Sequence, residues 1–244
     1  MDPFTPATFG ELNAKDYDAV HDPGTTEASV ALISDLAGTG RILELAIGTG
    51  RVALPLAARG HDIAGIEGSP EMVAKLREKP GGGDIDVVIG DMADVGMDGP
   101  FDHVFLVFNT LFNLQSQADQ VRCFQNVADR LAPGGTFLIE AFVPDFSGFT
   151  DNQRVTARNL TQTGVWLDAC THDPVAQLLE FQRIRMTDQG LKLVPLRLRY
   201  ACPPELDLMA QMAGLTRAHR WGGWGKDPFD AHSRMHVSVY QKPA

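Results

Sequence analysis

The sequence predicts an α/β protein whose main sheet is doubly wound and mostly parallel, with a small antiparallel β insertion. Three observations support this fold class. Apolar strand-like runs alternate with helix-like segments over residues 42–143. A glycine-rich turn follows the first of these runs, which is typical of a parallel sheet that binds a ligand at its carboxyl edge. Residues 165–200 then have the pattern of hairpins without intervening helices.

The composition limits the partners that we expect. A chain of 244 residues that is 44% hydrophobic can bury a full core, most simply as one domain with an insertion. Its net charge of -10 disfavours a nucleic acid and favours a small molecule or peptide. Cys123, Cys170 and Cys202 are too widely spaced to indicate a disulfide framework or a zinc site. With no export signal and no membrane-spanning run, we expect a soluble, cytoplasmic protein without a membrane partner.

The first strand leads into a tight turn. Residues 42–51 read I-L-E-L-A-I-G-T-G-R, and a run that is apolar on both faces suits a central parallel strand. Gly48 and Gly50 let the backbone turn sharply and lie close to a ligand. Residues 51–59 follow as a short helix that Gly60 ends, so the helix N-terminus points at the ligand. Such a turn by itself also occurs in strand–turn–helix units that bind nothing.

The turn has the pattern E-x-A-x-G-x-G instead of the G-x-G-x-x-G of dinucleotide-binding proteins, which disfavours an NAD-dependent dehydrogenase. It resembles the first motif of the class I S-adenosylmethionine (SAM)-dependent methyltransferases, which have a seven-stranded Rossmann-like sheet. In that family an acidic residue sits in the strand, and the glycines pass under the amino-acid part of SAM. The resemblance implies that SAM is the cofactor and that the residues binding it here are Glu44, Ala46, Gly48, Thr49, Gly50 and Arg51.

The second strand, residues 61–66, stops at an acidic residue, Glu67. The next helix is expected at residues 71–78, with Ser69 as its cap and Pro70 in its first position. A carboxylate about twenty residues beyond the glycine turn can accept from both hydroxyls of a nucleoside ribose. Strand ends are also often acidic for solubility, but the distance to the first motif favours function. The cofactor residues expected in this segment are Glu67, Gly68, Ser69 and Met72.

The third strand, residues 84–90, ends on Asp91 and Met92. The resemblance implies that Asp91 accepts from the adenine amino group and that Met92 lies against the ring. The fourth strand, residues 101–108, opens into F-N-T-L-F-N-L. This segment lacks the polar-Pro-Pro-aromatic motif of many nucleic-acid and protein N-methyltransferases, and is similar to small-molecule methyltransferases that act on amino sugars and other natural products. Phe108 and Asn109 are assigned to the cofactor site, although Asn is also a routine turn residue.

The chain divides into three parts. Residues 1–40 form an N-terminal lid, in which Tyr17 either lies near the cofactor or only packs the segment down. Residues 41–144 and 203–244 form the SAM-binding core, and residues 145–202 form the insertion, which serves as a substrate cover, a homodimer surface, or both. The other expected elements are helices at 26–36, 117–131 and 203–212, a loop at 144–163, and strands at 136–143, 165–171, 177–187, 191–200, 215–221 and 236–241.

Positive charge is concentrated in the insertion, on Arg183, Arg185, Lys192, Arg197 and Arg199. The alternation of these residues favours a solvated outer face over recognition of an acidic substrate. Near the C-terminus, two tryptophans lie among glycines. They either line the substrate pocket or bury against the insertion, and they are Trp221 and Trp224.

Methyl transfer from a sulfonium is an in-line displacement, so the enzyme mainly holds donor and acceptor close and collinear. A general base helps some acceptors, and the candidates are His21, Asp145 and the two that we favour, His232 and His172. No metal-binding set is assembled. The sequence therefore predicts a SAM-dependent methyltransferase that acts on N, O or C of a small metabolite in natural product biosynthesis. The alternative is a SAM-binding protein of this fold without methyl transfer, such as a cyclase, a rearrangement catalyst or a sensor.

Overall fold

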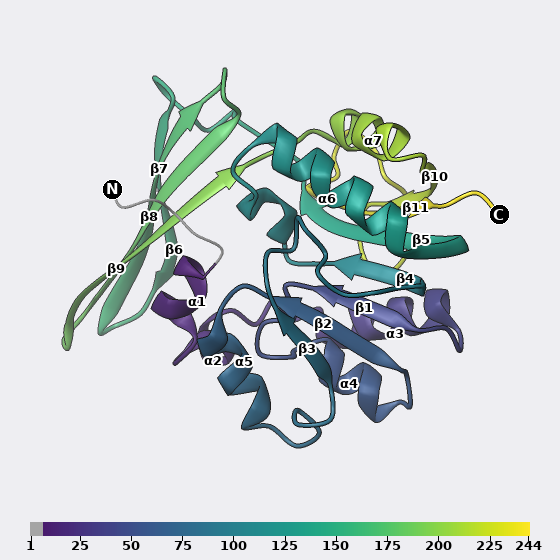
Figure 1. Cartoon of the computed structure of the whole chain (residues 1–244). Coiled ribbons are helices and arrows are strands. Elements are labelled where there is room, and N and C mark those ends of the chain that lie inside the picture. Colours follow the sequence, from purple (N-terminus) through teal and green to yellow (C-terminus); the bar gives the residue numbers. More distant parts are fainter. Residues whose placement is uncertain (1–6) are drawn as a thin grey trace.

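The computed structural model describes residues 7–244, which form two sheets with their helices. Residues 1–6 of the predicted lid lie outside the described residues. The main sheet has seven strands in the order β10-β11-β5-β4-β1-β2-β3, and the second has four in the order β6-β7-β8-β9. The second sheet stands beside the edge toward which the parallel strands point (Figure 1). The predicted fold class is confirmed.

Five strands of the main sheet are parallel, as predicted. β1 pairs with β2 and β4, β2 with β3, and β4 with β5. The closing pair is antiparallel, with β11 against β5 and β10 against β11. Every residue of β1 and β2 is buried, because helices cover both faces of a parallel sheet. The strands are β1 (Ile42–Leu45), β2 (Ile63–Glu67), β3 (Asp86–Ile89), β4 (Phe101–Leu106), β5 (Leu131–Phe142), β10 (Thr216–Trp221) and β11 (Met235–Gln241).

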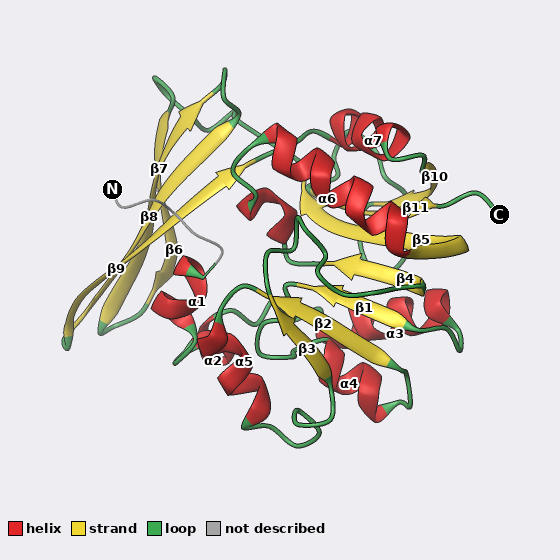
Figure 2. Cartoon of the chain, viewed as in Figure 1, coloured by secondary structure: helices red, strands yellow, loops and turns green. Residues whose placement is uncertain are grey.

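Helices pack on both faces of this sheet (Figure 2). One apolar cluster contains Phe124 of α6 and Met209 of α7, and the other contains Ile33 of α3, Leu56 of α4 and Leu76 of α5. No helix of residues 7–244 is long and apolar enough to cross a membrane. The bounds are α3 (Thr26–Ala37), α4 (Ala53–Ala58), α5 (Pro70–Arg77), α6 (Gln117–Arg130), α7 (Pro203–Met212) and a short 3-10 helix, η1 (Thr110–Asn113).

Two short helices, α1 (Thr8–Asn13) and α2 (Tyr17–Val20), precede α3 and lie over the carboxyl edge of the main sheet. Gly10 packs tightly on the start of α5, since a Cβ at this position would lie 2.3 Å from the Cβ of Ser69. Asp18 binds the glycine-rich turn, accepting from the hydroxyl of Thr49 at 2.5 Å. Its other oxygen lies 2.6 Å from the ammonium nitrogen of Lys79. These contacts hold the N-terminal segment against the core.

The insertion is a four-stranded antiparallel sheet, one strand larger than predicted. The expectation of a loop over residues 144–163 is wrong where β6 forms. The residues of β6 are mostly exposed, so the strand lacks the apolar alternation that marks a strand in a sequence. Pairing with β7 stabilises this edge strand instead. The four strands are β6 (Gln153–Leu160), β7 (Gly164–Asp173), β8 (Leu178–Thr187) and β9 (Gly190–Arg199).

Candidate functional site

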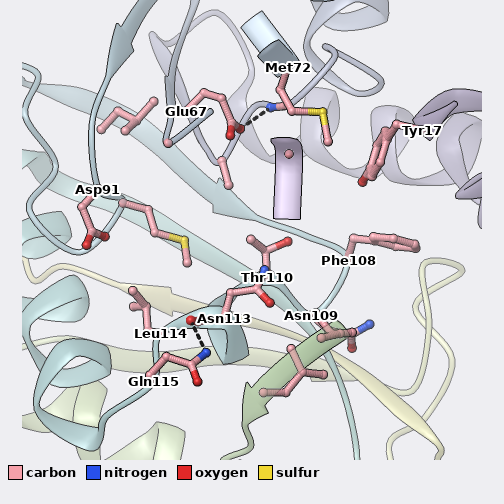
Figure 3. A pocket seen from close by; sticks show the side chains of 18 of the residues that line it. Tyr17, Glu67, Met72, Asp91, Phe108, Asn109, Thr110, Asn113, Leu114 and Gln115 are labelled. Atoms are coloured by element: carbon pink, nitrogen blue, oxygen red, sulfur yellow. Dashed lines mark hydrogen bonds between the residues drawn. The ribbon is translucent and has the colours of Figure 1, made fainter. Parts of the chain in front are cut away.

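A cavity of about 470 Å³ lies between the carboxyl edge of the main sheet, the N-terminal helices and the inner face of the second sheet. This volume suits a site for small molecules. Glu67 and Met72 face Thr110 and Asn113 across it (Figure 3). Of the predicted cofactor residues, those that line the cavity are Tyr17, Ala46, Gly48, Glu67, Gly68, Met72, Asp91, Met92, Phe108 and Asn109.

The glycine-rich turn has a left-handed backbone at three positions. Ala46, Gly48 and Gly50 have φ of 54°, 58° and 79°. Gly50 is required sterically as well, because a Cβ would lie 2.3 Å from a methyl carbon of Leu76. Ala46 and Gly48 line the cavity, whereas Gly50 lies behind them against α5. The turn therefore presents its backbone to the cavity, as the sequence predicts.

Glu67 is the buried carboxylate at the end of β2, with 8% of its surface exposed. One carboxylate oxygen accepts from the amide of Gly48 at 2.8 Å, and the other accepts from the amide of Ser69 at 2.9 Å. Burial raises the pKa of Glu67, while these amide donors oppose that shift. A carboxylate has about four acceptor positions, so two amides leave capacity for a ligand that donates hydroxyls.

Next to Glu67, the cavity has an apolar strip and a second carboxylate. Met72 and Met92 line it together with Ile66, which the sequence analysis did not select. Asp91 follows β3, and its Oδ1 accepts from the amide of Ala93 at 2.8 Å. Flat apolar surface beside a hydrogen-bond acceptor suits a purine ring with an exocyclic amine.

Five predicted cofactor residues lie behind the cavity wall and support it. Glu44 is buried beneath the turn, accepts from the amide of Ala53, and has its pKa raised well above the usual value by burial. Thr49 donates to the lid residue Asp18. Arg51 donates to the hydroxyl of Thr26 at 3.0 Å, and its guanidinium lies 5.3 Å from the ring centre of Phe108. The remaining two are Gly50, which packs on α5, and Ser69, which caps α5 by accepting from the amide of Met72 at 3.3 Å, as predicted.

The segment after β4 is shaped by two residues with positive φ. Phe108 and Asn109 have φ of 61° and 63°. The amide of Phe108 donates to the carboxylate of Glu140 at 2.7 Å, and Oδ1 of Asn109 accepts from the amide of Phe142 at 2.6 Å. Asn109 thus lines the cavity and is also a turn residue, and its assignment to the cofactor stays a prediction.

The far side of the cavity is polar and comes from η1 and the residues that follow it. Thr110, Asn113 and Gln115 line this side. The side-chain nitrogen Nε2 of Gln115 donates to the backbone carbonyl oxygens of Asn113 at 2.7 Å and Arg197 at 2.9 Å. These bonds connect η1 to β9 of the insertion. The sequence-based prediction selected Phe108 and Asn109 just before this segment, but none of Thr110, Asn113 and Gln115.

The lid contributes Tyr17 to the cavity. Burial raises the pKa of Tyr17 to about 12, so its hydroxyl stays protonated at neutral pH. A second lid residue, Asp16, reaches the insertion, with its carboxylate 3.1 Å from the guanidinium of Arg185 and 3.3 Å from the ammonium of Lys192. The N-terminal segment, which the sequence predicts to be a lid, therefore contacts both sheets beside the cavity.

The inner face of the insertion contributes residues that the sequence analysis missed or misassigned. Arg158, Leu196 and Leu198 line the cavity together with Arg183. The expectation of a solvated outer face is wrong for Arg199, whose side chain is 5% exposed, and for Arg183 and Arg185, whose side chains are only 26% and 12% exposed. Arg183 and Arg185 lie on the face that pairs with the buried side of β9. The alternation of Val194, Leu196 and Leu198 is the sequence signal that identifies this inner face.

The structure does not bring the favoured histidines to the cavity. The ring of His172 stacks on Phe146, with 4.0 Å between ring centres, and its Nε2 lies 3.0 Å from the hydroxyl of Tyr200. His232 is exposed in the loop between β10 and β11. His21, His172, His232 and Asp145 are absent from the residues that line the cavity, and so are Trp221 and Trp224. Trp224 instead packs in the apolar cluster of α3 and α4.

Known proteins of similar sequence are methyltransferases. A family model described as a methyltransferase domain matches residues 42–135. The CcbJ methyltransferase from Streptomyces caelestis is 38% identical, over 99% of this chain and 100% of that chain, and its structure aligns with a TM-score of 0.92. The chain belongs to the class I SAM-dependent methyltransferases.

Two further relatives support this assignment. The cypemycin N-terminal methyltransferase of a Streptomyces species is 26% identical to this methyltransferase, over 97% of this chain and 98% of its own. The SAM-bound CalS10 from Micromonospora echinaspora is 21% identical and shares the fold over 93% of this chain and 95% of its own, with a TM-score of 0.71. The predicted enzyme class and cofactor are confirmed, and the alternative without methyl transfer is not favoured.

Proposed function

We propose that this methyltransferase transfers the methyl group of SAM to a nitrogen atom of a small acceptor, such as a natural product, bound in the same cavity. One observation carries the proposal. A single cavity joins an end lined by Glu67 and Asp91 to an opposite side lined by Thr110, Asn113 and Gln115. The first end has the donor set for a nucleoside, and the second leaves polar groups for another molecule.

The residues at the first end fit SAM. Glu67 is proposed to hold the two ribose hydroxyls, since its two bound amides leave free acceptor positions. Asp91 is proposed to accept from the adenine amine, with Met72 and Met92 against the ring. The backbone of the turn at Gly48 is proposed to lie under the amino-acid part. When bound, SAM supplies a methyl group on a positively charged sulfur that is activated for displacement.

The acceptor atom is proposed to be nitrogen because a neutral amine needs no base. Among the described residues that line the cavity there is no histidine. The carboxylates at the first end are committed to the cofactor in this proposal, and Tyr17 stays protonated at neutral pH. Another carboxylate of the lining, Asp119, is bound by Arg122 at 2.7 Å and by the hydroxyl of Ser116 at 2.6 Å. A relative that covers 97% of this chain is named as an N-terminal methyltransferase. The chain's task is then to exclude water and align the acceptor, which the lid and insertion do together.

Two measurements test this function. Titration calorimetry with SAM and with its demethylated product should show one binding site. SAM with a radioactive methyl group, incubated with the enzyme and a small-molecule extract of the cells that make it, should then yield a labelled product. The chemical shift of the transferred methyl group in an NMR spectrum distinguishes nitrogen from oxygen and carbon. Binding without labelling would contradict the proposal, and a methyl group on oxygen would refute the choice of nitrogen.

Two partner expectations belong to the same proposal. The insertion serves as a homodimer surface as well as a substrate cover, because its edge strand β6 exposes Val155 at 68% and Leu160 at 72%. Light scattering of the wild-type enzyme and of a Val155→Lys variant tests this surface. We also propose that nucleic acid is not a substrate, because the net charge of -10 disfavours binding to a phosphate backbone. The three free cysteines favour the reducing cytoplasm as its location.

A further inference from the structure

The inner face of the insertion has a defined order of side chains. Directly opposite residues of an antiparallel sheet project from the same face. The register places Asp168 of β7 and Val194 of β9 on either side of Arg183 of β8. Val194 is 1% exposed, which shows that this face is turned inward. Arg158 of β6 lies at a register shift in the pairing with β7, between Ala157 and Asn159, and also lines the cavity.

Two guanidinium groups share one carboxylate on this face. The guanidinium nitrogen of Arg158 lies 3.5 Å from Asp168, and that of Arg183 lies 3.8 Å from it. Within residues 7–244 neither guanidinium makes a hydrogen bond, so their donors stay available to a ligand. One carboxylate neutralises one of the two charges. These three side chains therefore carry a net positive charge with spare donors, and the two arginines among them line the cavity of an otherwise acidic protein.

Two other largely buried arginines of the same sheet, Arg185 and Arg199, lack this spare capacity. Arg185 lies 3.1 Å from Asp16 and stacks on Trp166 at 4.4 Å. Arg199 is buried and donates to Glu205 at 2.8 Å. A guanidinium fork with free donors matches a carboxylate or phosphate in geometry as well as charge. Arg158 and Arg183 are thus the pair suited to bind an anion.

We propose, resting on the methyl transfer inferred above, that the acceptor carries an anionic group, a carboxylate or a phosphate, which Arg183 and Arg158 bind. Asp168 is a positioning residue that orients the two guanidiniums. The acidic end of the cavity, at Glu67 and Asp91, repels the same anionic group. The acceptor therefore binds in one orientation, with its anion at the insertion and its nitrogen free to face the cofactor end. Specificity for an anionic acceptor then comes from the insertion.

The first experiment determines which group the acceptor carries. The product labelled from radioactive SAM in the cell extract is divided into three portions for electrophoresis. One is untreated, one is treated with carbodiimide and an amine to convert carboxylates to amides, and one is treated with alkaline phosphatase. A mobility change after carbodiimide identifies a carboxylate, and a change after phosphatase identifies a phosphate. A labelled product that changes in neither treatment overturns this inference but leaves the proposed methyl transfer intact, whereas no labelled product overturns both.

The second experiment assigns the anion to Arg183. Labelling rates over serial dilutions of the purified acceptor give KM and kcat for the wild type, Arg183→Gln and Arg183→Lys. We expect Arg183→Gln to raise the acceptor KM about ten- to hundredfold, with kcat within about twofold and SAM affinity unchanged. Arg183→Lys keeps the charge but loses the fork, so it should recover part of the loss.

The matched control is Arg197→Gln. This arginine belongs to the same sheet, but its side chain pairs with Glu180 at 3.3 Å and does not line the cavity. The control should keep the wild-type KM. An unchanged acceptor KM in a folded Arg183→Gln enzyme would show that the guanidinium pair only stabilises the sheet through Asp168, which overturns the proposal. Equal losses in Arg183→Gln and Arg197→Gln would overturn it as well.

Discussion

The two sheets contribute to the cavity in different ways. The parallel sheet contributes through the ends of its strands, so Glu67 after β2 and Asp91 after β3 meet at one edge. The antiparallel sheet contributes through one face, so its part depends on which of two alternating sets is turned inward. A site built from strand ends can be predicted from a sequence, whereas a site built from a sheet face cannot, because packing decides which face is turned inward.

The two contributions also differ in charge. The parallel sheet supplies carboxylates, and the insertion supplies guanidinium groups. If the carboxylates bind the cofactor and the guanidiniums bind the acceptor, variants in one sheet should affect one ligand and spare the other. Of the four predictions below, in order of decreasing effect, the first and the last test this separation, and the two between them test what stabilises the main sheet and its turn.

The largest effect is expected at Glu67. Glu67→Ala removes the charged acceptor proposed for the ribose, and should weaken SAM binding about ten- to hundredfold, because a charged hydrogen bond contributes about 1.5 to 3 kcal/mol. Calorimetry with SAM measures the change, and the acceptor KM at saturating SAM should stay near the wild-type value. The control is Glu71→Ala, which removes an exposed carboxylate four residues away and should leave SAM affinity unchanged. Unchanged affinity in a folded Glu67→Ala enzyme would remove Glu67 from the site.

The second effect follows from the burial of the parallel sheet. His103 of β4 is 0% exposed, and burial lowers its pKa to about 3, below the usual 6.5. Between pH 6.5 and pH 3, His103 is therefore protonated in the unfolded chain but neutral in the folded chain. Its contribution to stability is complete above pH 6.5 and falls as the pH drops toward 3. Between pH 7 and pH 5 the loss from one such histidine is about 2 kcal/mol.

Urea unfolding at pH 7 and pH 5 measures this dependence. His103→Gln should reduce the stability difference between the two pH values by about 2 kcal/mol. His232→Gln, which changes an exposed loop residue, should leave the difference as in the wild type. The same difference in both variants would show that His103 does not set the acid sensitivity of the main sheet.

The third effect concerns the turn where the main sheet meets the acceptor side. Asn109→Ala loses the hydrogen bond from the amide of Phe142. It also places alanine, which tolerates the left-handed region less well than asparagine, at φ of 63°. We expect a loss of about 2 kcal/mol in the free energy of unfolding. Asn109→Gly loses the hydrogen bond but relieves the backbone strain, so its loss should be about 1 kcal/mol. If urea unfolding finds the glycine variant no better than the alanine variant, left-handed strain does not govern this turn.

The smallest effect is expected where the lid joins the two sheets. Asp16→Asn weakens the contacts with Arg185 and Lys192, and should raise the acceptor KM about two- to fivefold, because exposed ion pairs contribute about 0.2 to 1 kcal/mol. The effect should shrink at high salt, which screens exposed charges. Asp35→Asn breaks a comparable surface pair with Lys226 and serves as the control. A KM effect that persists at high salt would contradict an ionic latch.

The structure agrees with the sequence-based predictions where the residues next to each other in the chain determine the local structure. The limits of α7 agree with the prediction at both ends, since Pro203 starts the helix and Gly214 follows its end with φ of 76°. The cofactor end was predicted from strand tips, and Glu67, Asp91 and Gly48 do line one cavity. The prediction was wrong for β6. Its residues are mostly exposed and show no apolar alternation, and its pairing with β7 cannot be inferred from its own side chains.

The sequence by itself determined the order of the main-sheet strands and of the helices that cover them, the glycine turn and the acidic tips that identify the enzyme class, because each depends on residues that are neighbours in the chain. Only the tertiary structure decided that Arg183 faces inward, that His172 packs on Phe146 away from the cavity, and that Glu44 supports the turn from behind. Either face of a sheet can be turned inward, and a histidine can contact many different residues. Packing against elements that are distant in the sequence decides both. The side chains that line the acceptor side of this methyltransferase are therefore decided by tertiary packing.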